Sequence, residues 1–129
     1  MPELTLIDLK GTTISSKTLL KNKCVVFFWT EDATAHLSAS HKKAIEFHKQ
    51  NPDYQFIAIN IDNNHEKWIA TLANYKFDDV KEFRIKDFDE LKEKWAFTKL
   101  QRTIVIDENG TIKYGFENMF DVNFVKCLN

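Results

Sequence analysis

The chain has 129 residues, 43% of them hydrophobic and 13% aromatic, and this length and composition fit one domain with a sizeable core. Its formal net charge of -1 at pH 7, without a basic run, argues against a broad nucleic-acid-binding surface. The longest apolar run is far too short to span a membrane, and two cysteines provide no disulfide framework.

The N-terminal segment predicts a small β-hairpin followed by a helical turn. Residues 4–9 and 12–14 are the expected strands, with Gly11 at the turn between them. Residues 15–20 then predict one capped turn of helix. We expect this hairpin to cover an edge of the core.

The most informative stretch of the chain is a strand that leads directly into a helix. Residues 24–30 are a continuous apolar and β-branched run, which predicts a strand buried on both faces. Thr30, Glu31 and Asp32 are residue types that satisfy or attract the free N–H groups of a helix start. Residues 37–48 then repeat apolar positions every three or four residues, as a helix does. An α/β sheet presents its chemistry at such a junction.

The middle of the chain predicts a second strand and a second helix. Residues 51–53 form a turn, and residues 54–61 predict another buried strand. Asn63 and Glu66 have the spacing of a capping box, so we expect a helix to start there. Its apolar stripe would consist of Trp68, Ile69, Leu72 and Tyr75.

The last third of the chain predicts a strand, a short helix, a hairpin and a final helix. Residues 80–85 are the strand, and Asp87 begins the short helix as its cap. Residues 102–107 and 111–116 pair around a tight turn. Asp121 is expected to start the final helix, with Val122, Phe124, Val125 and Leu128 on its apolar side.

Two motifs and this order of elements carry a family resemblance. Phe28 and Trp29 end the central strand, and residues 103–110 read Thr-Ile-Val-Ile-Asp-Glu-Asn-Gly. Together they resemble the thioredoxin-like fold, in its TlpA/ResA-type (AhpC/TSA-like) branch of thiol–disulfide oxidoreductases. The resemblance covers essentially residues 1–129. It implies a single α/β domain, a three-layer sandwich of a mixed sheet with helices on both faces and an N-terminal β-hairpin extension.

The chain departs from this family at the positions that carry its chemistry. The family's two cysteines lie at the helix start, and the matching positions here hold Ala33 and His36. Without sulfur there, no mixed disulfide can form. The family's cis-proline position holds Arg102, and a non-proline cis bond costs roughly 3 kcal/mol, so we expect a trans peptide before Arg102.

Neither remaining cysteine is expected to replace the missing pair. Cys24 begins the central strand and so lies roughly 20 Å from the helix start, at about 3.3 Å per residue. Cys127 falls in the final helix, and we expect both thiols to be buried and inert. The main interpretation is a redox-inactive domain with a binding or structural role, no catalytic residue and no cofactor. The alternative that the family implies is a thiol–disulfide oxidoreductase or peroxiredoxin-like enzyme that uses one of these cysteines.

Polar residues occupy the vacated site and form the candidate binding set, which comprises Trp29, Glu31, Asp32, His36, Arg102 and Thr103. Asp32 and His36 are four apart and would share a helix face, as a pair capable of acid–base chemistry or metal binding. A metal needs at least a third ligand. His41 points elsewhere on the helix and lies roughly 10 Å from His48, so no metal is expected. A solvated helix cap with an ion pair to Arg102, or an anion site, are the other interpretations.

The expected partner is a protein or peptide, rather than nucleic acid or a membrane. No signal peptide is visible in the chain, since residues 1–3 lead directly into strand-like sequence. The resemblance nevertheless implies the periplasm or cell envelope, as part of a longer protein or after removal of a targeting segment. A cytoplasmic protein is the alternative.

Overall fold

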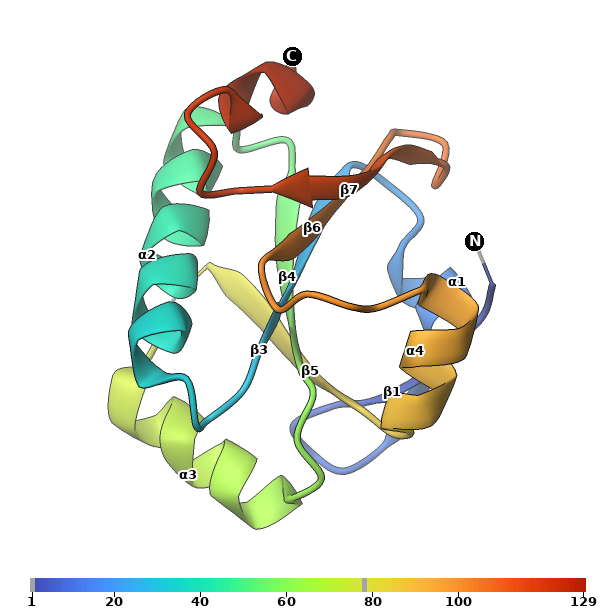
Figure 1. The fold of residues 1–129 in the computed structure, drawn as a ribbon, viewed down its shortest axis with the longest axis vertical. Helices are drawn as coiled ribbons and strands as arrows, with labels where there is room; N and C mark the ends of the chain where they lie inside the picture. The colour runs from blue at the N-terminus through green and yellow to red at the C-terminus, as the bar shows by residue number, and fades with distance from the viewer. Residues whose placement is uncertain (1, 78) are drawn as a thin grey trace.

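The structure is a computed structural model that describes residues 2–77 and 79–129. Within these residues, seven strands form one mixed sheet in the order β2-β1-β5-β4-β3-β6-β7, with helices on both faces (Figure 1). The strands are β1 (Thr5–Ile7), β2 (Thr13–Ser15), β3 (Cys24–Trp29), β4 (Gln55–Asn60), β5 (Val80–Ile85), β6 (Arg102–Ile106) and β7 (Ile112–Asn118), and the helices are α1 (Ser16–Leu19), α2 (Thr34–Gln50), α3 (His65–Tyr75), α4 (Phe88–Trp95) and the 3-10 helix η1 (Phe124–Leu128).

Strand β3 is the centre of the sheet. It runs parallel to β4 and antiparallel to β6, while β4 runs parallel to β5 and β6 antiparallel to β7. All six of its residues are buried, because helices cover both of its faces. The predicted three-layer α/β fold is therefore confirmed, and so is the N-terminal hairpin, which joins the sheet through β1 and β5.

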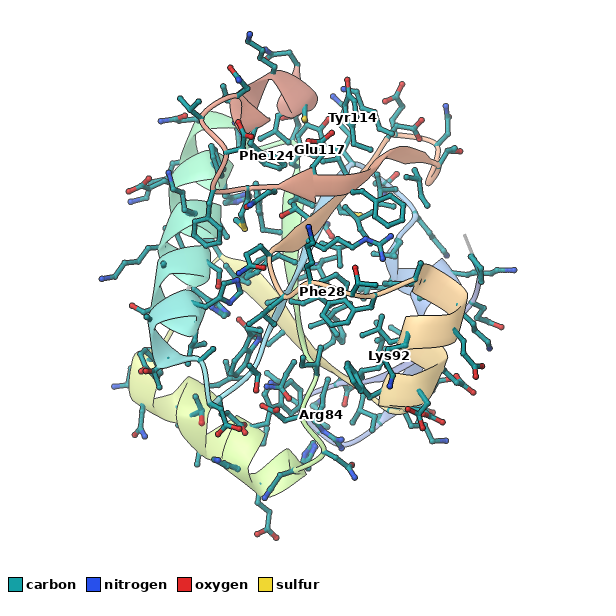
Figure 2. All side chains as sticks on the ribbon, viewed as in Figure 1. Phe28, Arg84, Lys92, Tyr114, Glu117 and Phe124 are labelled. Carbon is teal, nitrogen blue, oxygen red and sulfur yellow. The ribbon has the colours of Figure 1, made fainter. Side chains whose placement is uncertain are left out.

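The sheet separates two apolar cores, because successive residues of a strand point to opposite faces. Val26 and Phe28 of β3 pack on the face covered by α1 and α4. Val25, Phe27 and Trp29 pack on the opposite face, covered by α2, α3 and η1. Figure 2 shows Phe28 near the centre of the molecule. Burial of each such side chain contributes about 1.5–3 kcal/mol, so β3 holds both layers together.

Helix α2 confirms the predicted helix but not its predicted cap. The helix begins at Thr34, and the residue before it, Ala33, makes no side-chain capping bond. Thr30 donates its hydroxyl to Asp62 over 2.7 Å, and the Glu31 backbone N–H donates to the same carboxylate over 2.8 Å. The prediction that residues 30–32 cap the helix is therefore wrong, because Asp62, two residues after β4 ends, binds the first two of them.

The caps of the next two helices agree with the prediction to within one residue. Asn64, rather than Asn63, caps α3 by accepting the Lys67 backbone N–H over 3.0 Å. Asp87 caps α4 as predicted, since its carboxylate accepts two backbone N–H groups of the first turn. In α3 the expected apolar stripe is correct except at its end, where Tyr75 is exposed.

The C-terminal helix is the least accurate part of the prediction. The segment forms a 3-10 helix that starts at Phe124 and buries Phe124, Cys127 and Leu128. Asp121 instead accepts the Asn123 N–H over 2.8 Å, which holds the preceding residues in a turn. Val122, predicted to be on the apolar side, is 89% exposed, and Val125 is also exposed.

Candidate functional site

The vacated site lies where β3 ends, α2 begins and β6 begins. These ends meet because β3 and β6 are antiparallel, with Phe27 opposite Thr103. The structure thus places Ala33 and Arg102 at the same end of the sheet, as the resemblance implies. The described residues contain no cis peptide bond, so the trans peptide expected before Arg102 is confirmed.

The two positions that would hold cysteines carry no nucleophile. Ala33 is half-buried, and its carbonyl accepts the Leu37 N–H over 2.9 Å as the first bond of α2. The half-buried His36 packs on Phe120, with ring centroids 5.6 Å apart. Burial, and then the nearby His41, lower the pKa of His36. His36 is therefore a neutral imidazole packed against an aromatic ring.

Asp32 and His36 do not form the predicted pair. Asp32 precedes the helix, and its 91% exposed side chain lies 3.9 Å from Lys67 Nζ. The Nδ1 atom of His36 is buried and has no hydrogen-bond partner among the described residues. The prediction that both residues share a helix face is wrong, because α2 begins two residues after Asp32.

A pair of carboxyl groups, the buried Glu31 and the half-buried Asp62, lies beside the vacated positions. Glu31 is buried, with Oε2 4.0 Å from Lys67 Nζ and with Oε1 lacking any partner among the described residues. Burial raises the pKa of Asp62, but hydrogen bonds from Thr30, the Glu31 N–H and Asn60 outweigh it and hold that pKa below its ordinary value. Asp62 is therefore the charged member of the pair.

Glu31 is the member that retains a proton near neutral pH. Burial, followed by the charge of Asp62 and a hydrogen bond to it, raises the pKa of Glu31 from 4.5 to about 7. A protonated carboxyl next to a carboxylate can share a hydrogen bond, whereas two carboxylates repel each other. This arrangement makes the local charge depend on pH between 4.5 and 7.

We expect Glu31→Gln to flatten the pH dependence of stability. Because the folded pKa lies above the unfolded one, the contribution of Glu31 is complete below pH 4.5 and is lost as the pH rises through about 7. Glu31 should therefore lower the free energy of unfolding of the natural chain by roughly 1–2 kcal/mol across this window. This decrease should be absent in the Glu31→Gln variant. Urea unfolding at pH 5 and pH 7.5 measures the difference.

The exposed Glu66 of α3 provides a matched control, and Glu66→Gln should leave the pH dependence unchanged. The buried Glu82 is present in all three proteins and cancels from the comparison. If the free energy of unfolding of Glu31→Gln changed with pH as much as that of the natural chain, Glu31 would ionise alike in the folded and unfolded states.

A buried polar network lies beneath the site, and sequence reasoning did not find it. The Trp29 indole N–H donates to Glu82 Oε1 over 3.2 Å, and His41 Nε2 lies 2.9 Å from Glu82 Oε2. His41 Nδ1 lies 2.8 Å from the Leu37 carbonyl, and Phe77 stacks on the His41 ring at 3.9 Å. Trp29 is completely buried, so it supports the site from below and does not present its ring to a partner.

This network holds one proton between its two titratable groups. A carbonyl oxygen only accepts, so Nδ1 of His41 carries a hydrogen and donates it to Leu37. The contact between His41 Nε2 and Glu82 then holds either an imidazolium with a carboxylate or a neutral imidazole with a protonated carboxyl. Burial raises the pKa of Glu82, although the His41 contact opposes this effect.

Arg102 does not form the expected ion pair. Its Nε donates to the Gly115 carbonyl over 2.7 Å, and Nη1 donates to the Trp95 carbonyl. Its guanidinium carbon lies 4.0 Å from the centroid of the Phe116 ring. Among residues 2–77 and 79–129, no carboxylate lies within salt-bridge distance of Arg102. Asp32, His36 and Arg102 therefore bind to three different sets of neighbours.

A cavity of about 450 Å³ opens beside Arg102. Residues of the segment 98–102 and of the end of β7, residues 116–118, line it. Phe116 is 71% exposed at this cavity, and sequence reasoning did not select it. The sequence marked it only as one of three large apolar residues that alternate along the edge strand β7, together with Ile112 and Tyr114. Thr103 is fully buried and accepts the Met119 N–H over 3.0 Å, so it fixes the chain around the cavity.

The two cysteines lie on opposite faces of the sheet. Cys24 packs in the core under α1 and α4, and Cys127 packs in the core under α2 and α3. Both are unpaired and buried. Burial raises the pKa of Cys24 to about 12 and is the main cause of the raised pKa of Cys127. No pair of thiols can meet without unfolding the sheet.

Within the part of the chain that the structure describes, no group of three or more histidine, cysteine, aspartate or glutamate side chains is arranged to hold a metal ion. The helices of the same part lack the length and apolar character needed to cross a membrane.

Comparisons with known proteins agree with this architecture. A family model described as thioredoxin-like matches residues 21–112. Among curated proteins, none matches the chain. Solved structures match over nearly the whole chain. A Bacteroides vulgatus protein assigned to the thiol-disulfide oxidoreductases superposes with a TM-score of 0.80 at 16% identity, covering 98% of this chain and 90% of its own.

Two further neighbours give the same result. A domain of a Cytophaga hutchinsonii protein, assigned to the thiol-disulfide isomerases, has a TM-score of 0.80 at 19% identity, covering 98% of this chain and 86% of its own. The exposed lipoprotein thioredoxin of Streptococcus pneumoniae has a TM-score of 0.71 at 16% identity, covering 97% and 98%. At these identities the neighbours establish the fold, and the family model covers well over half of the chain. The chain belongs to the thioredoxin-like family.

Proposed function

We propose that this thioredoxin-like domain performs no thiol–disulfide exchange and that it binds a protein or peptide partner at the vacated end of its sheet. The observation that carries the first part is the placement of sulfur. Cys24 and Cys127 are buried in separate cores, and the helix start holds Ala33 and His36. Disulfide exchange requires a thiolate that can reach its target.

The chemistry of both thiols supports this proposal. A thiol with a pKa of about 12, as for Cys24, is ionised in roughly one molecule in 10⁵ at pH 7. Burial, the first cause, and the charge of Glu117 raise the pKa of Cys127. A catalytic cysteine has the opposite properties, namely a lowered pKa and access to solvent.

The open groups around Arg102 support the binding role. An arginine with no ion-pair partner among the described residues, a 71% exposed Phe116 and a cavity of about 450 Å³ lie together at the position where the family has its cis-proline. Exposed aromatic and arginine side chains are the residue types most enriched where proteins bind each other. In this proposal, a recognition surface occupies the place where the family has its reactive centre.

Thiol reactivity tests the proposal. We expect both cysteines of the folded protein to react with iodoacetamide far more slowly than those of the urea-unfolded chain, without a titration step below pH 8.5. Mass spectrometry of samples quenched over time, at several pH values, follows each cysteine separately. A fast phase at one cysteine with an apparent pKa below 8.5 would support the alternative, an oxidoreductase that works with a partner's thiol.

An envelope location belongs to the same proposal. It rests on the TlpA/ResA-type resemblance and on the Streptococcus pneumoniae neighbour, which is an exposed lipoprotein. Fractionation of the source cells with an antibody against this domain tests it. Recovery in the envelope fraction is the expected result, and recovery with the cytoplasmic proteins would refute this part.

A further inference from the structure

The Arg102 guanidinium is held in place, but no carboxylate of residues 2–77 and 79–129 pairs with it. Two of its nitrogens donate to the Gly115 and Trp95 carbonyls, and the Phe116 ring covers one of its faces. The third nitrogen, Nη2, has no hydrogen-bond partner among the described residues and is not fully enclosed by the protein. It is therefore the nitrogen of Arg102 that remains available to a ligand.

A buried positive charge without a counter-charge is unfavourable, and a ligand can correct this. Arg102 is only 8% exposed, and burial lowers its pKa. Backbone carbonyls supply partial negative charge but no full one. Because the guanidinium is already fixed by two hydrogen bonds and a stacked ring, an anion that binds Nη2 meets a preorganised donor.

The charges on this side of the cavity favour an anion. Lys99 and Arg102 contribute two positive charges. Glu117 also borders the cavity, but it follows Phe116 in β7, so its side chain points to the opposite face of the strand, where burial and then the charge of Glu117 raise the pKa of Cys127. The face that Phe116 and Arg102 share is therefore positive.

The exposed Phe116 adds an apolar contact next to the charge. One face of the ring covers Arg102, whereas 71% of the residue remains exposed. Because ring and guanidinium are 4.0 Å apart, a ligand must carry its anionic and apolar groups on neighbouring atoms. The last residue of a peptide does this, since its carboxylate and its side chain leave the same carbon.

We propose that the cavity beside Arg102 binds the C-terminus of a partner polypeptide that ends in an apolar residue. The terminal carboxylate binds Arg102 Nη2, and the terminal side chain packs on Phe116. Gln101 and Asn118, which also line the cavity, supply amide groups for the ligand backbone. This inference rests on the proposed function, since it names the partner's chemistry at the same site.

Three short peptides test the inference by nuclear magnetic resonance titration of the ¹⁵N-labelled protein at low salt. The probes are acetyl-Ala-Ala-Phe with a free carboxylate, the same peptide as its C-terminal amide, and acetyl-Ala-Asp-Phe-amide. The free acid should bind at least about tenfold more tightly than the amide, as expected for a hydrogen bond to a charged group. Signals of residues 98–102 and 115–118 should shift. Equal affinities of acid and amide would refute the inference.

The third peptide separates the two sources of a carboxylate. It carries its acid on a side chain and should bind as weakly as the amide. Binding as tight as that of the free acid would refute the C-terminal assignment. Shifts confined to another part of the domain would refute the site itself.

Variants at exposed positions avoid a loss of folding. Phe116→Ala should weaken binding of the free acid several-fold through lost apolar contact. Phe88→Ala is the matched control, since Lys92 lies 5.1 Å over that ring on α4, outside the cavity. Figure 2 shows Lys92 on α4 and Glu117 on β7 well apart.

The outcomes also distinguish this inference from the proposed function. Slow alkylation of both cysteines together with equal binding of acid and amide would refute only the C-terminus assignment. A rapid, low-pKa cysteine together with selective binding of the free acid would refute only the absence of redox chemistry.

Discussion

Replacement of Glu82 by alanine should lower the free energy of unfolding by about 3–5 kcal/mol, because it leaves two buried groups without a partner. The Trp29 indole N–H and the His41 ring both bind this carboxyl, over 3.2 Å and 2.9 Å. A domain of this size is stable by about 5–15 kcal/mol, so the loss is a large fraction of the total. Urea unfolding at pH 7 measures it.

Glutamine at position 82 separates hydrogen bonding from charge. Its amide oxygen can accept from Trp29, and its NH₂ group can donate to a neutral His41, whose Nδ1 already donates to Leu37. We therefore expect Glu82→Gln to cost less than about 1.5 kcal/mol. Glu66→Ala on the exposed face of α3 is the control and should change little. A Glu82→Ala loss no larger than that of the control would show that the network adds nothing to stability.

Introduction of cysteines at positions 33 and 36 should produce a redox-active disulfide. The two positions lie one helical turn apart at the start of α2. Cα atoms at this spacing are about 5.5 Å apart, a distance that a disulfide can bridge. The helix start also favours a thiolate through its unpaired N–H groups. The rate of dithiothreitol-coupled insulin reduction should rise from background to a measurable value in Ala33→Cys/His36→Cys.

The single variant Ala33→Cys is the control, because one thiol cannot resolve a mixed disulfide at this position. Mass spectrometry should detect the bridge as a loss of two hydrogens that dithiothreitol reverses. A double variant that folds but stays fully reduced in air would contradict the claim that only sulfur is missing from this helix start.

The strands and helices were predictable because they are set by local periodicity. The run of residues 24–30 identified β3, and apolar spacing identified α2. The caps were less predictable, since a distant residue decided them. Thr30 and Glu31 bind Asp62, which lies 31 or 32 residues further along the chain. The start of the final helix was predicted wrongly for a related reason, because the turn at Asp121 competes with helix formation.

The candidate site was only partly predictable. The resemblance placed Ala33, His36 and Arg102 at one end of the sheet, because motif positions follow the fold. It did not indicate that two carbonyls hold Arg102, since main-chain partners leave no mark on the sequence. The contact between His41 and Glu82 joins residues 41 positions apart. The sequence did offer one sign of this contact: a histidine lies within the apolar stripe of α2, and a glutamate lies within a predicted strand.

The central claim is that this domain lacks disulfide chemistry, and dithiothreitol-coupled reduction of insulin tests it most directly. The natural chain and the Cys24→Ser/Cys127→Ser variant should both give the rate of dithiothreitol alone. A rate above that background for the natural chain, lost in the double serine variant, would contradict the account.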